Sequence, residues 1–155
     1  MTDHELFDDV VRDLANPLDW ATVPAYEAEH RWRELRDWVG WLKDRYALDH
    51  RVIPPCWYLH GALIDLLSAL RDHHREHFNR YASPSAAAEW HVAFRNLEPR
   101  LREWAARTGC TRELHRPDLI IGWPDDTDRW NVHVAADKQQ RLTHEQAQPL
   151  DEPAA

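Results

Sequence analysis

The chain has 155 residues, of which 43% are hydrophobic and 30% are charged. This composition is that of a globular protein, and the length suits one domain with one core. A formal net charge of −8 disfavours non-specific nucleic-acid binding, which draws its affinity from cationic groups. No run approaches the ~18 consecutive apolar residues of a membrane span, and the acidic N-terminus is unlike a secretory signal, so we expect a cytoplasmic protein.

The aromatic and sulfur-containing residues add two further expectations. The chain holds nine tryptophans, several times the usual share. A buried indole removes about 200 Å² from water, so we expect most of these rings to lie in the core. The two cysteines, Cys56 and Cys110, form no CxxC pair, which predicts free thiols in a reducing compartment.

The first half of the chain predicts a short helix followed by a long one. Thr2 and Glu5 form a capping box that opens a short N-terminal helix, ending before Pro17. Over about residues 23–47, apolar side chains recur three and four positions apart, which is the strongest helical signal in the chain: Ala28, Trp32, Leu35, Val39, Leu42 and Tyr46. Trp38 and Trp41 widen this surface, so we expect this helix to lie centrally.

Two more long helices follow the break at Pro54 and Pro55. One is predicted over about residues 57–80, with a buried face of Leu59, Leu63, Leu66 and Leu70. The other is predicted over about residues 84–108, with an apolar stripe of Ala87, Trp90, Phe94, Leu97, Leu101 and Trp104. The predicted fold class is all-α, with three long amphipathic helices and a short N-terminal helix in a small bundle.

The helical signal fades beyond Gly109. Apolar residues alternate within residues 118–135, a pattern compatible with a short β-hairpin packed on the helices: Leu119, Ile121, Trp123, Trp130, Val132 and Val134. Residues 141–155 have the polar composition of a disordered tail. We therefore expect a single helical domain over residues 1–140, followed by this tail.

Several motifs in the middle of the chain carry a family resemblance. They are Cys56-Trp57-Tyr58-Leu59-His60, Leu67-Ser68-Ala69-Leu70, Trp90-His91 and Leu97-Glu98-Pro99-Arg100-Leu101. With these motifs, residues 38–105 resemble an uncharacterised domain family encoded mainly by actinobacterial plasmids, integrative elements and phages. The resemblance implies a mobile-element ancestry and an accessory role, and it brings no catalytic residues with it.

A candidate partner-binding site follows from two tryptophan–histidine pairs. Trp57 with His60 and Trp90 with His91 are expected on neighbouring helices, where they can form a small aromatic pocket with Arg71 and Arg95 at its rim. The more frequent outcome for tryptophan at such spacings is a core position, with each histidine bonded to a nearby polar group.

A second candidate is a metal site at His73 and His77, which lie one helical turn apart. Cys56 and His60 repeat that spacing at the other end of the same predicted helix, some 25 Å away at ~1.5 Å per residue, which is too far to share one ion. A site at either pair needs ligands from elsewhere, such as His115 or His133. Imidazoles are also favoured at a helix C-terminus without a metal, so we predict no metal and no cofactor, with His73 and His77 as the alternative.

Enzymatic activity is the weaker functional class, because no HExxH, GxSxG or phosphate-binding glycine loop is present. The leading hypothesis is a non-enzymatic helical accessory protein of a mobile element that binds a protein partner, since tryptophan and arginine are enriched at binding hot spots. One alternative is a nucleic-acid-associated protein that uses the arginine-rich segment 71–116. Another is a small metal-binding protein or enzyme centred on His73 and His77. Self-association is left open.

Overall fold

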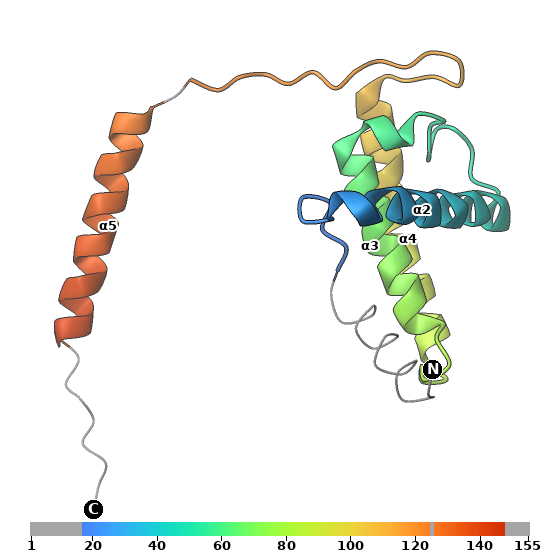
Figure 1. Ribbon diagram of the computed structural model, residues 1–155, viewed down its shortest axis with the longest axis horizontal. Helices are drawn as coiled ribbons and strands as arrows, with labels where there is room; N and C mark the ends of the chain where they lie inside the picture. The colour runs from blue at the N-terminus through green and yellow to red at the C-terminus, as the bar shows by residue number, and fades with distance from the viewer. Residues whose placement is uncertain (1–16, 125, 148–155) are drawn as a thin grey trace, which may run out of the picture. The chain divides into compact units, whose positions relative to one another are not determined.

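The computed structural model describes residues 17–124 and 126–147, which contain helices and no strand. The helices are α2 (Ala25–Tyr46), α3 (Gly61–His77), α4 (Ala86–Thr108) and α5 (Thr127–Ala147), with a short 3₁₀ turn, η1 (Trp57–Leu59), before α3 (Figure 1). The all-α class is thus confirmed for these residues, whereas the helix expected over residues 2–16 lies outside them. None of the four helices is long and apolar enough to cross a membrane.

The chain divides into two compact units whose boundary in the sequence lies between Asp118 and Leu119. The first unit contains α2, η1, α3 and α4, and the second contains α5.

The hairpin predicted over residues 118–135 is wrong. Residues 119–124 lie outside any regular element, and α5 begins at Thr127. The alternating apolar pattern is short on both sides, and a lone two-stranded hairpin is marginal in water. From Ala135 to Arg141 the sequence consists mostly of strong helix formers, which favours α5. Residues 141–147, expected in a tail, form the last turns of this helix, and residues 148–155 lie outside the described part of the chain.

The central helix is α3, not α2 as the widened aromatic surface of α2 suggested. α3 packs against α2, η1 and α4. Its side chains Leu63, Leu67 and Leu70 are completely buried, and the buried Arg71 and Ser68 extend this face around the helix, so α3 is covered by more than one neighbour. Trp41 of α2 is 40% exposed, so the second apolar face of α2 is not fully covered.

The helix predicted over residues 57–80 is interrupted at its start. Residues 57–59 form a 3₁₀ turn, and His60 adopts an extended backbone conformation (φ −125°, ψ 110°) before α3 begins at Gly61. The backbone N–H of Leu59 donates to the carbonyl of Cys56, and that of His60 donates to the carbonyl of Trp57. Cys56 and His60 are therefore held by a tight turn and not by successive turns of one α-helix.

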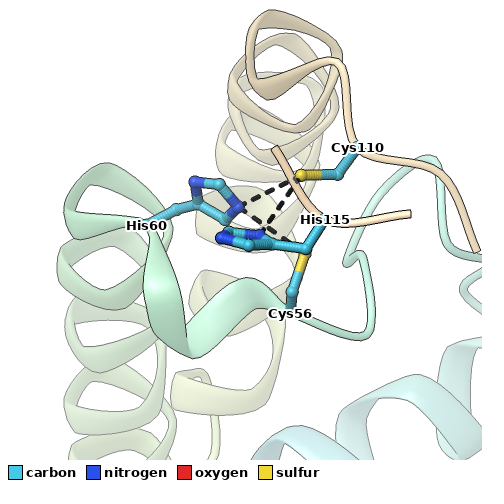
Figure 2. A group of neighbouring side chains, drawn as sticks. All are labelled: Cys56, His60, Cys110 and His115. Atoms are coloured by element: carbon cyan, nitrogen blue, oxygen red, sulfur yellow. Dashed lines mark hydrogen bonds between the residues drawn. The ribbon is translucent and has the colours of Figure 1, made fainter. Parts of the chain in front are cut away.

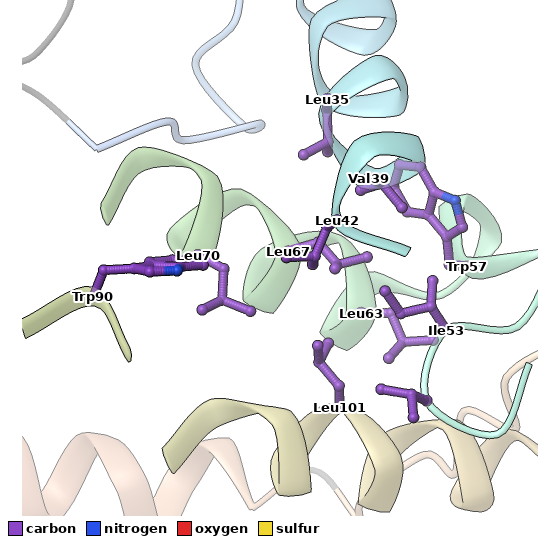
Figure 3. Packing of buried hydrophobic residues seen from close by; sticks show 11 residues of the cluster. Leu35, Val39, Leu42, Ile53, Trp57, Leu63, Leu67, Leu70, Trp90 and Leu101 are labelled. Atoms are coloured by element: carbon purple, nitrogen blue, oxygen red, sulfur yellow. The ribbon is translucent and has the colours of Figure 1, made fainter. Parts of the chain in front are cut away.

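The core is built mainly from leucine side chains of α2, α3 and α4, together with Trp90 of α4 and with Ile53 and Trp57 from the segment before α3 (Figure 3). Trp90 is completely buried and Trp57 is 7% exposed, and Trp20, Trp32 and Trp38 are partly buried against them. Five of the nine tryptophans therefore contribute to the core. The apolar face of α4 differs from the predicted stripe by one residue at each end. Ala86 is buried in place of Ala87, and Ala105 is buried in place of Trp104.

Several buried polar groups in this core are paired with one another, whereas the indole N–H of Trp38 is buried without a hydrogen-bond partner among the described residues. The indole N–H of Trp90 donates to the Tyr46 hydroxyl at 2.9 Å, and that of Trp20 donates to the Ser68 hydroxyl at 2.9 Å. Arg71, only 3% exposed, donates to the Glu34 carboxylate at 3.0 Å. These pairings are needed because a buried polar group without a partner destabilises a fold.

Replacing Trp90 by alanine is expected to lower the free energy of unfolding by about 3–5 kcal/mol, because the change removes buried surface and leaves a cavity. Trp104→Ala is a matched control on the same helix. Its ring is 38% exposed and contacts the Arg107 guanidinium at 4.6 Å, so we expect a loss of about 1 kcal/mol or less. Urea unfolding of both variants measures the difference, and equal losses would contradict this account of the core.

Candidate metal centre

α3 and α4 pack side by side as an antiparallel pair joined by residues 78–85 (Figure 1). The N-terminal end of α3 therefore lies beside the C-terminal end of α4. The chain segments that precede α3 and follow α4 meet at this end of the pair, although about 50 residues separate them in sequence.

Four ligand-type side chains converge there: Cys56, His60, Cys110 and His115 (Figure 2). Each contributes one nitrogen or sulfur atom, and these four atoms all lie within 4.8 Å of one another. The Nε2 atom of His60 is 3.6 Å from the Cys56 sulfur and 3.3 Å from the Cys110 sulfur. The Cys110 sulfur is also 3.7 Å from Nδ1 of His115. Neither cysteine forms a disulfide.

The first half of the centre is positioned by the turn before α3. Val52, Ile53 and Pro54 are buried, and the N–H of Trp57 donates to the Pro54 carbonyl at 3.0 Å. Because Trp57 is anchored in the core, the turn has a fixed orientation. The extended conformation of His60 completes the turn, and His60 as a whole residue is 1% exposed.

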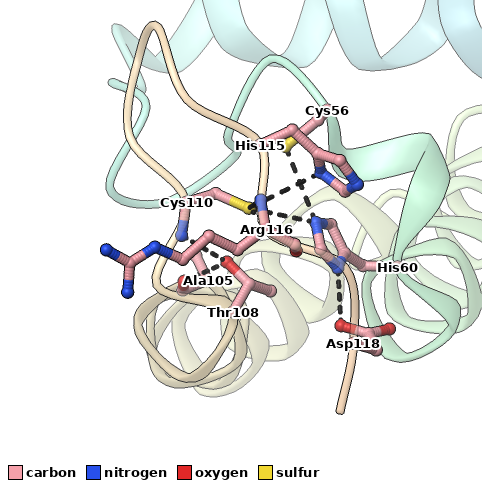
Figure 4. A network of polar contacts seen from close by, with 8 residues as sticks. All are labelled: Cys56, His60, Ala105, Thr108, Cys110, His115, Arg116 and Asp118. Atoms are coloured by element: carbon pink, nitrogen blue, oxygen red, sulfur yellow. Dashed lines mark hydrogen bonds and ion pairs between the residues drawn. The ribbon is translucent and has the colours of Figure 1, made fainter.

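The second half is positioned by the end of α4 and the loop that follows. Gly109 ends the helix in the left-handed region (φ 65°), which glycine adopts without steric cost. The backbone N–H of Cys110 then donates to the Thr108 hydroxyl at 3.1 Å, and that hydroxyl donates to the Ala105 carbonyl at 2.8 Å (Figure 4). The chain thus reverses and brings Cys110 and His115 back towards α3.

The loop between these two ligands is closed by its own hydrogen bonds. The Thr111 hydroxyl accepts the backbone N–H of Leu114 at 3.0 Å, and the Thr111 N–H donates to the Leu114 carbonyl at 2.9 Å. The backbone N–H of Arg116 donates to the Cys110 sulfur at 3.2 Å (Figure 4). A sulfur that accepts such a bond is stabilised in its thiolate form.

The two thiols differ in acidity. Burial raises the pKa of the Cys56 thiol, and the nearby Cys110 sulfur adds to this shift. Burial also opposes ionisation of Cys110, but the Arg116 N–H, Thr108, Cys56 and His115 together outweigh it and lower the pKa of Cys110 to about 6. Cys110 is therefore a thiolate near neutral pH, which is the form that binds metals and attacks electrophiles.

Asp118 extends the network on the far side of His60. Its carboxylate oxygen lies 2.6 Å from Nδ1 of His60 (Figure 4). A carboxylate at this position fixes the proton on Nδ1 and leaves the lone pair of Nε2 directed at the two sulfurs. The centre is thus organised around one buried imidazole with a defined tautomer.

The structure distributes the predicted partner-binding residues over different environments. Trp57 is nearly buried and Trp90 is completely buried, so the Trp90 ring offers no surface to a ligand. Arg71 is buried against Glu34, whereas His91 and Arg95 are exposed on α4. His60 belongs to the four-residue cluster.

A groove of about 690 Å³ lies at the surface of α2 and the residues around Pro55. Of the predicted partner-binding residues it contains only Trp57, together with Glu29, Trp32, Arg33, Arg36, Pro55 and Tyr58.

His73 and His77, the alternative metal pair, contact each other near the C-terminal end of α3. Their Nδ1 atoms are 2.7 Å apart, and Nε2 of His77 is 3.4 Å from a Glu89 carboxylate oxygen. Among the described residues, three or more potential metal ligands come together in the cluster at the opposite end of α3. The sequence pattern therefore indicated Cys56, His60 and His115 as potential ligands but did not group them with Cys110.

The sequence does contain a signal for this cluster. Each of the two cysteines is followed by a histidine four or five residues later, which is a ligand spacing. The order cysteine, histidine, cysteine, histidine conceals it, because familiar zinc motifs place two cysteines before two histidines.

No protein-family model, curated protein or solved structure matches this chain.

Acidification is expected to destabilise the fold through the histidines of α3. Burial lowers the pKa of His73, with a further contribution from the charge of His77, and burial likewise lowers the pKa of His74, aided by His73. The unfolded chain then binds more protons than the folded one once the pH falls below the ordinary value of about 6.5. The free energy of unfolding should therefore decrease from pH 6.5 downwards and reach its low plateau below the folded pKa values.

The variant His74→Gln tests this, because it removes one titrating group from the contact with Trp41, whose ring lies 4.6 Å away. We expect a shallower dependence of unfolding free energy on pH than in the wild type. His133→Gln, at an exposed position of α5, is the control. Identical pH profiles for the wild type and His74→Gln would show that His74 is not involved.

Proposed function

We propose that this chain is a non-enzymatic interaction module that binds a protein partner through its second unit, as an accessory protein of a mobile genetic element. The observation that supports partner binding is the run of exposed apolar side chains between Leu119 and Trp123. The mobile-element role rests on the sequence resemblance of residues 38–105.

This run is unusually apolar for a surface. Leu119, Ile120 and Ile121 are 85%, 91% and 72% exposed, and Trp123 is 90% exposed. Four large apolar side chains thus occupy five consecutive positions, in a segment outside any helix. Contiguous exposed apolar surface is typical of binding sites, and tryptophan is among the commonest hot-spot residues.

The following helix, α5, has the same need for a partner. None of its 21 residues is buried. Helices in proteins gain most of their stability from packing an apolar face, and exposed side-chain pairs such as Asp137 with Arg141, 2.7 Å apart, add little. Trp130 and Val134, which are exposed one helical turn apart, offer a surface on which a partner can pack, and Val132 is exposed on another face.

Nucleic-acid binding is less well supported by the arginine-rich segment 71–116. Arg71 is buried against Glu34, and Arg100, Arg102 and Arg107 form ion pairs with glutamates of their own helix. Phosphate binding through these side chains has to compete with the existing pairs. A nucleic-acid affinity that falls steeply with rising salt would favour this alternative.

The proposal predicts that replacing Ile120, Ile121 and Trp123 together by serine abolishes partner binding and leaves the first unit folded. These side chains are exposed, so the melting temperature should change little. A photo-crosslinking residue at position 119, in cells of the native host, should join a defined protein to the wild type, and the triple variant should lose at least about nine-tenths of this product.

Two controls accompany this measurement. Tyr26→Ser, 85% exposed on α2, removes an equally accessible apolar side chain from the first unit and should leave the crosslink unchanged. Sedimentation of the purified chain shows whether the partner is a second copy. Equal crosslinking by the wild type and the triple variant would refute the proposed docking segment.

A further inference from the structure

We infer that Cys56, His60, Cys110 and His115 bind one zinc ion as a closed, four-coordinate structural site, and that Asp118 orients His60 for this purpose. The inference concerns the first unit alone and does not rest on the proposed partner binding.

The spacing of the ligand atoms matches a tetrahedral zinc site. Zinc lies about 2.3 Å from cysteine sulfur and about 2.0–2.1 Å from histidine nitrogen, so tetrahedral angles place sulfur and nitrogen ligands about 3.6 Å apart. Three sulfur-to-nitrogen distances in the cluster are 3.6, 3.3 and 3.7 Å. All four atoms lie within 4.8 Å of one another, so the widest pair has to close by about 1 Å on a zinc ion, whose tetrahedral ligand atoms lie about 3.3–3.8 Å apart.

The donor set selects zinc among the common metals. Two thiolates and two imidazoles in a tetrahedron are typical of zinc, whereas magnesium and calcium prefer oxygen ligands and copper(II) prefers flatter geometries. Two thiolates also neutralise a divalent cation while both imidazoles stay uncharged. Four protein ligands leave no open position for water, which is the arrangement of structural and not catalytic zinc.

The position of Asp118 supports metal ligation by His60. Histidines that bind a metal usually donate their other ring N–H to a carboxylate or a carbonyl. The distance of 2.6 Å between Nδ1 of His60 and the Asp118 oxygen fits such a bond, with Nε2 as the ligand atom. Asp118 is 46% exposed, whereas the His60 side chain is 2% exposed, so the carboxylate reaches the buried ring from the surface.

A competing interpretation is a nucleophile–base–acid triad formed by Cys110, His60 and Asp118, whose contacts have the required order. Two features favour the metal. The Cys56 sulfur lies 3.6 Å from the same Nε2 atom, and the His115 ring lies 5.1 Å from the His60 ring, although a triad needs neither. The groove around Trp57 is also lined by other residues, so it presents no substrate to Cys110.

Elemental analysis of the full chain, purified from zinc-containing medium, is expected to give about one zinc ion per chain. X-ray absorption at the zinc edge should show two sulfur neighbours at about 2.3 Å and two nitrogen neighbours at about 2.0–2.1 Å. This measurement needs no variant. Less than about a tenth of an ion per chain, together with no uptake of added cobalt(II), would overturn the inference, as would a shell of oxygen and nitrogen alone.

Single substitutions assign the ligands. Cys110→Ala and His115→Ala should each abolish the sulfur-to-cobalt charge-transfer pattern of the wild type or change its shape, because each removes one ligand. His133→Ala, in α5, is the matched histidine control and should bind cobalt as the wild type does. A wild-type spectrum in Cys110→Ala would exclude this cluster. Alkylation of Cys110 that abolishes hydrolysis of a test ester, without bound metal, would support the triad instead.

Asp118 is a positioning residue, and its substitution should act differently from loss of a ligand. Asp118→Asn is expected to weaken zinc binding about 10- to 100-fold in competition with a chromogenic chelator, while the cobalt spectrum keeps the shape of a site with two sulfur and two nitrogen ligands. Glu113→Gln, in the same exposed loop, is the control. Equal zinc affinities for Asp118→Asn and the wild type would remove Asp118 from the site.

A last measurement links the metal to the loop that it holds. Trypsin should cleave after Arg112 at least about tenfold faster in the presence of a strong chelator, because the loop from Cys110 to Asp118 loses its attachment to the turn before α3. Cleavage after Arg80, between α3 and α4 and remote from the cluster, is the internal control. Unchanged cleavage after Arg112 would show that no metal restrains this loop.

Discussion

The burial of α3 between α2 and α4 is the constraint on which the remaining architecture depends. Leu63, Leu67 and Leu70 are fully buried, and Trp90 of α4 is buried in the same cluster. This packing fixes α3 and α4 as an antiparallel pair, and so it sets the N-terminal end of one helix beside the C-terminal end of the other. The cysteine–histidine cluster exists because both of its halves are attached to those two ends.

The helices supply rigidity to the cluster, whereas the ligands themselves lie on irregular backbone. His60 precedes α3 in an extended conformation, and Cys110 follows a glycine with positive φ. If His60 or Cys110 lay within a regular helix, its side chain would point along the surface of that helix and would not reach the end of the other helix. The two departures from helical geometry are therefore what allows four ligand atoms to converge, and each is fixed by buried neighbours or hydrogen bonds close to the helix end.

The sequence predicts the three long helices well, because three- and four-residue spacing of apolar side chains is a local signal. It also identifies Leu63, Leu70 and Trp90 as core. It does not predict α5, where short alternating runs suggest strands and helix propensity prevails. Nor does it predict the cluster, because His60 and Cys110 are 50 residues apart and come together only when α3 and α4 pack as an antiparallel pair. His115 was recognisable as a ligand type, but only the fold shows which residues share its site.

The loop from Thr111 to Asp118 shows why a metal suits this part of the chain. Every residue in it is exposed, so the hydrophobic effect contributes little to holding it against the helices. Its internal hydrogen bonds close the loop on itself but do not join it to the helices. Metal–thiolate and metal–imidazole bonds supply the missing attachment without requiring a larger core. Since Asp118 immediately precedes Leu119, an anchored loop also fixes the point from which the exposed apolar segment leaves the first unit, and less chain entropy is then lost when that segment binds.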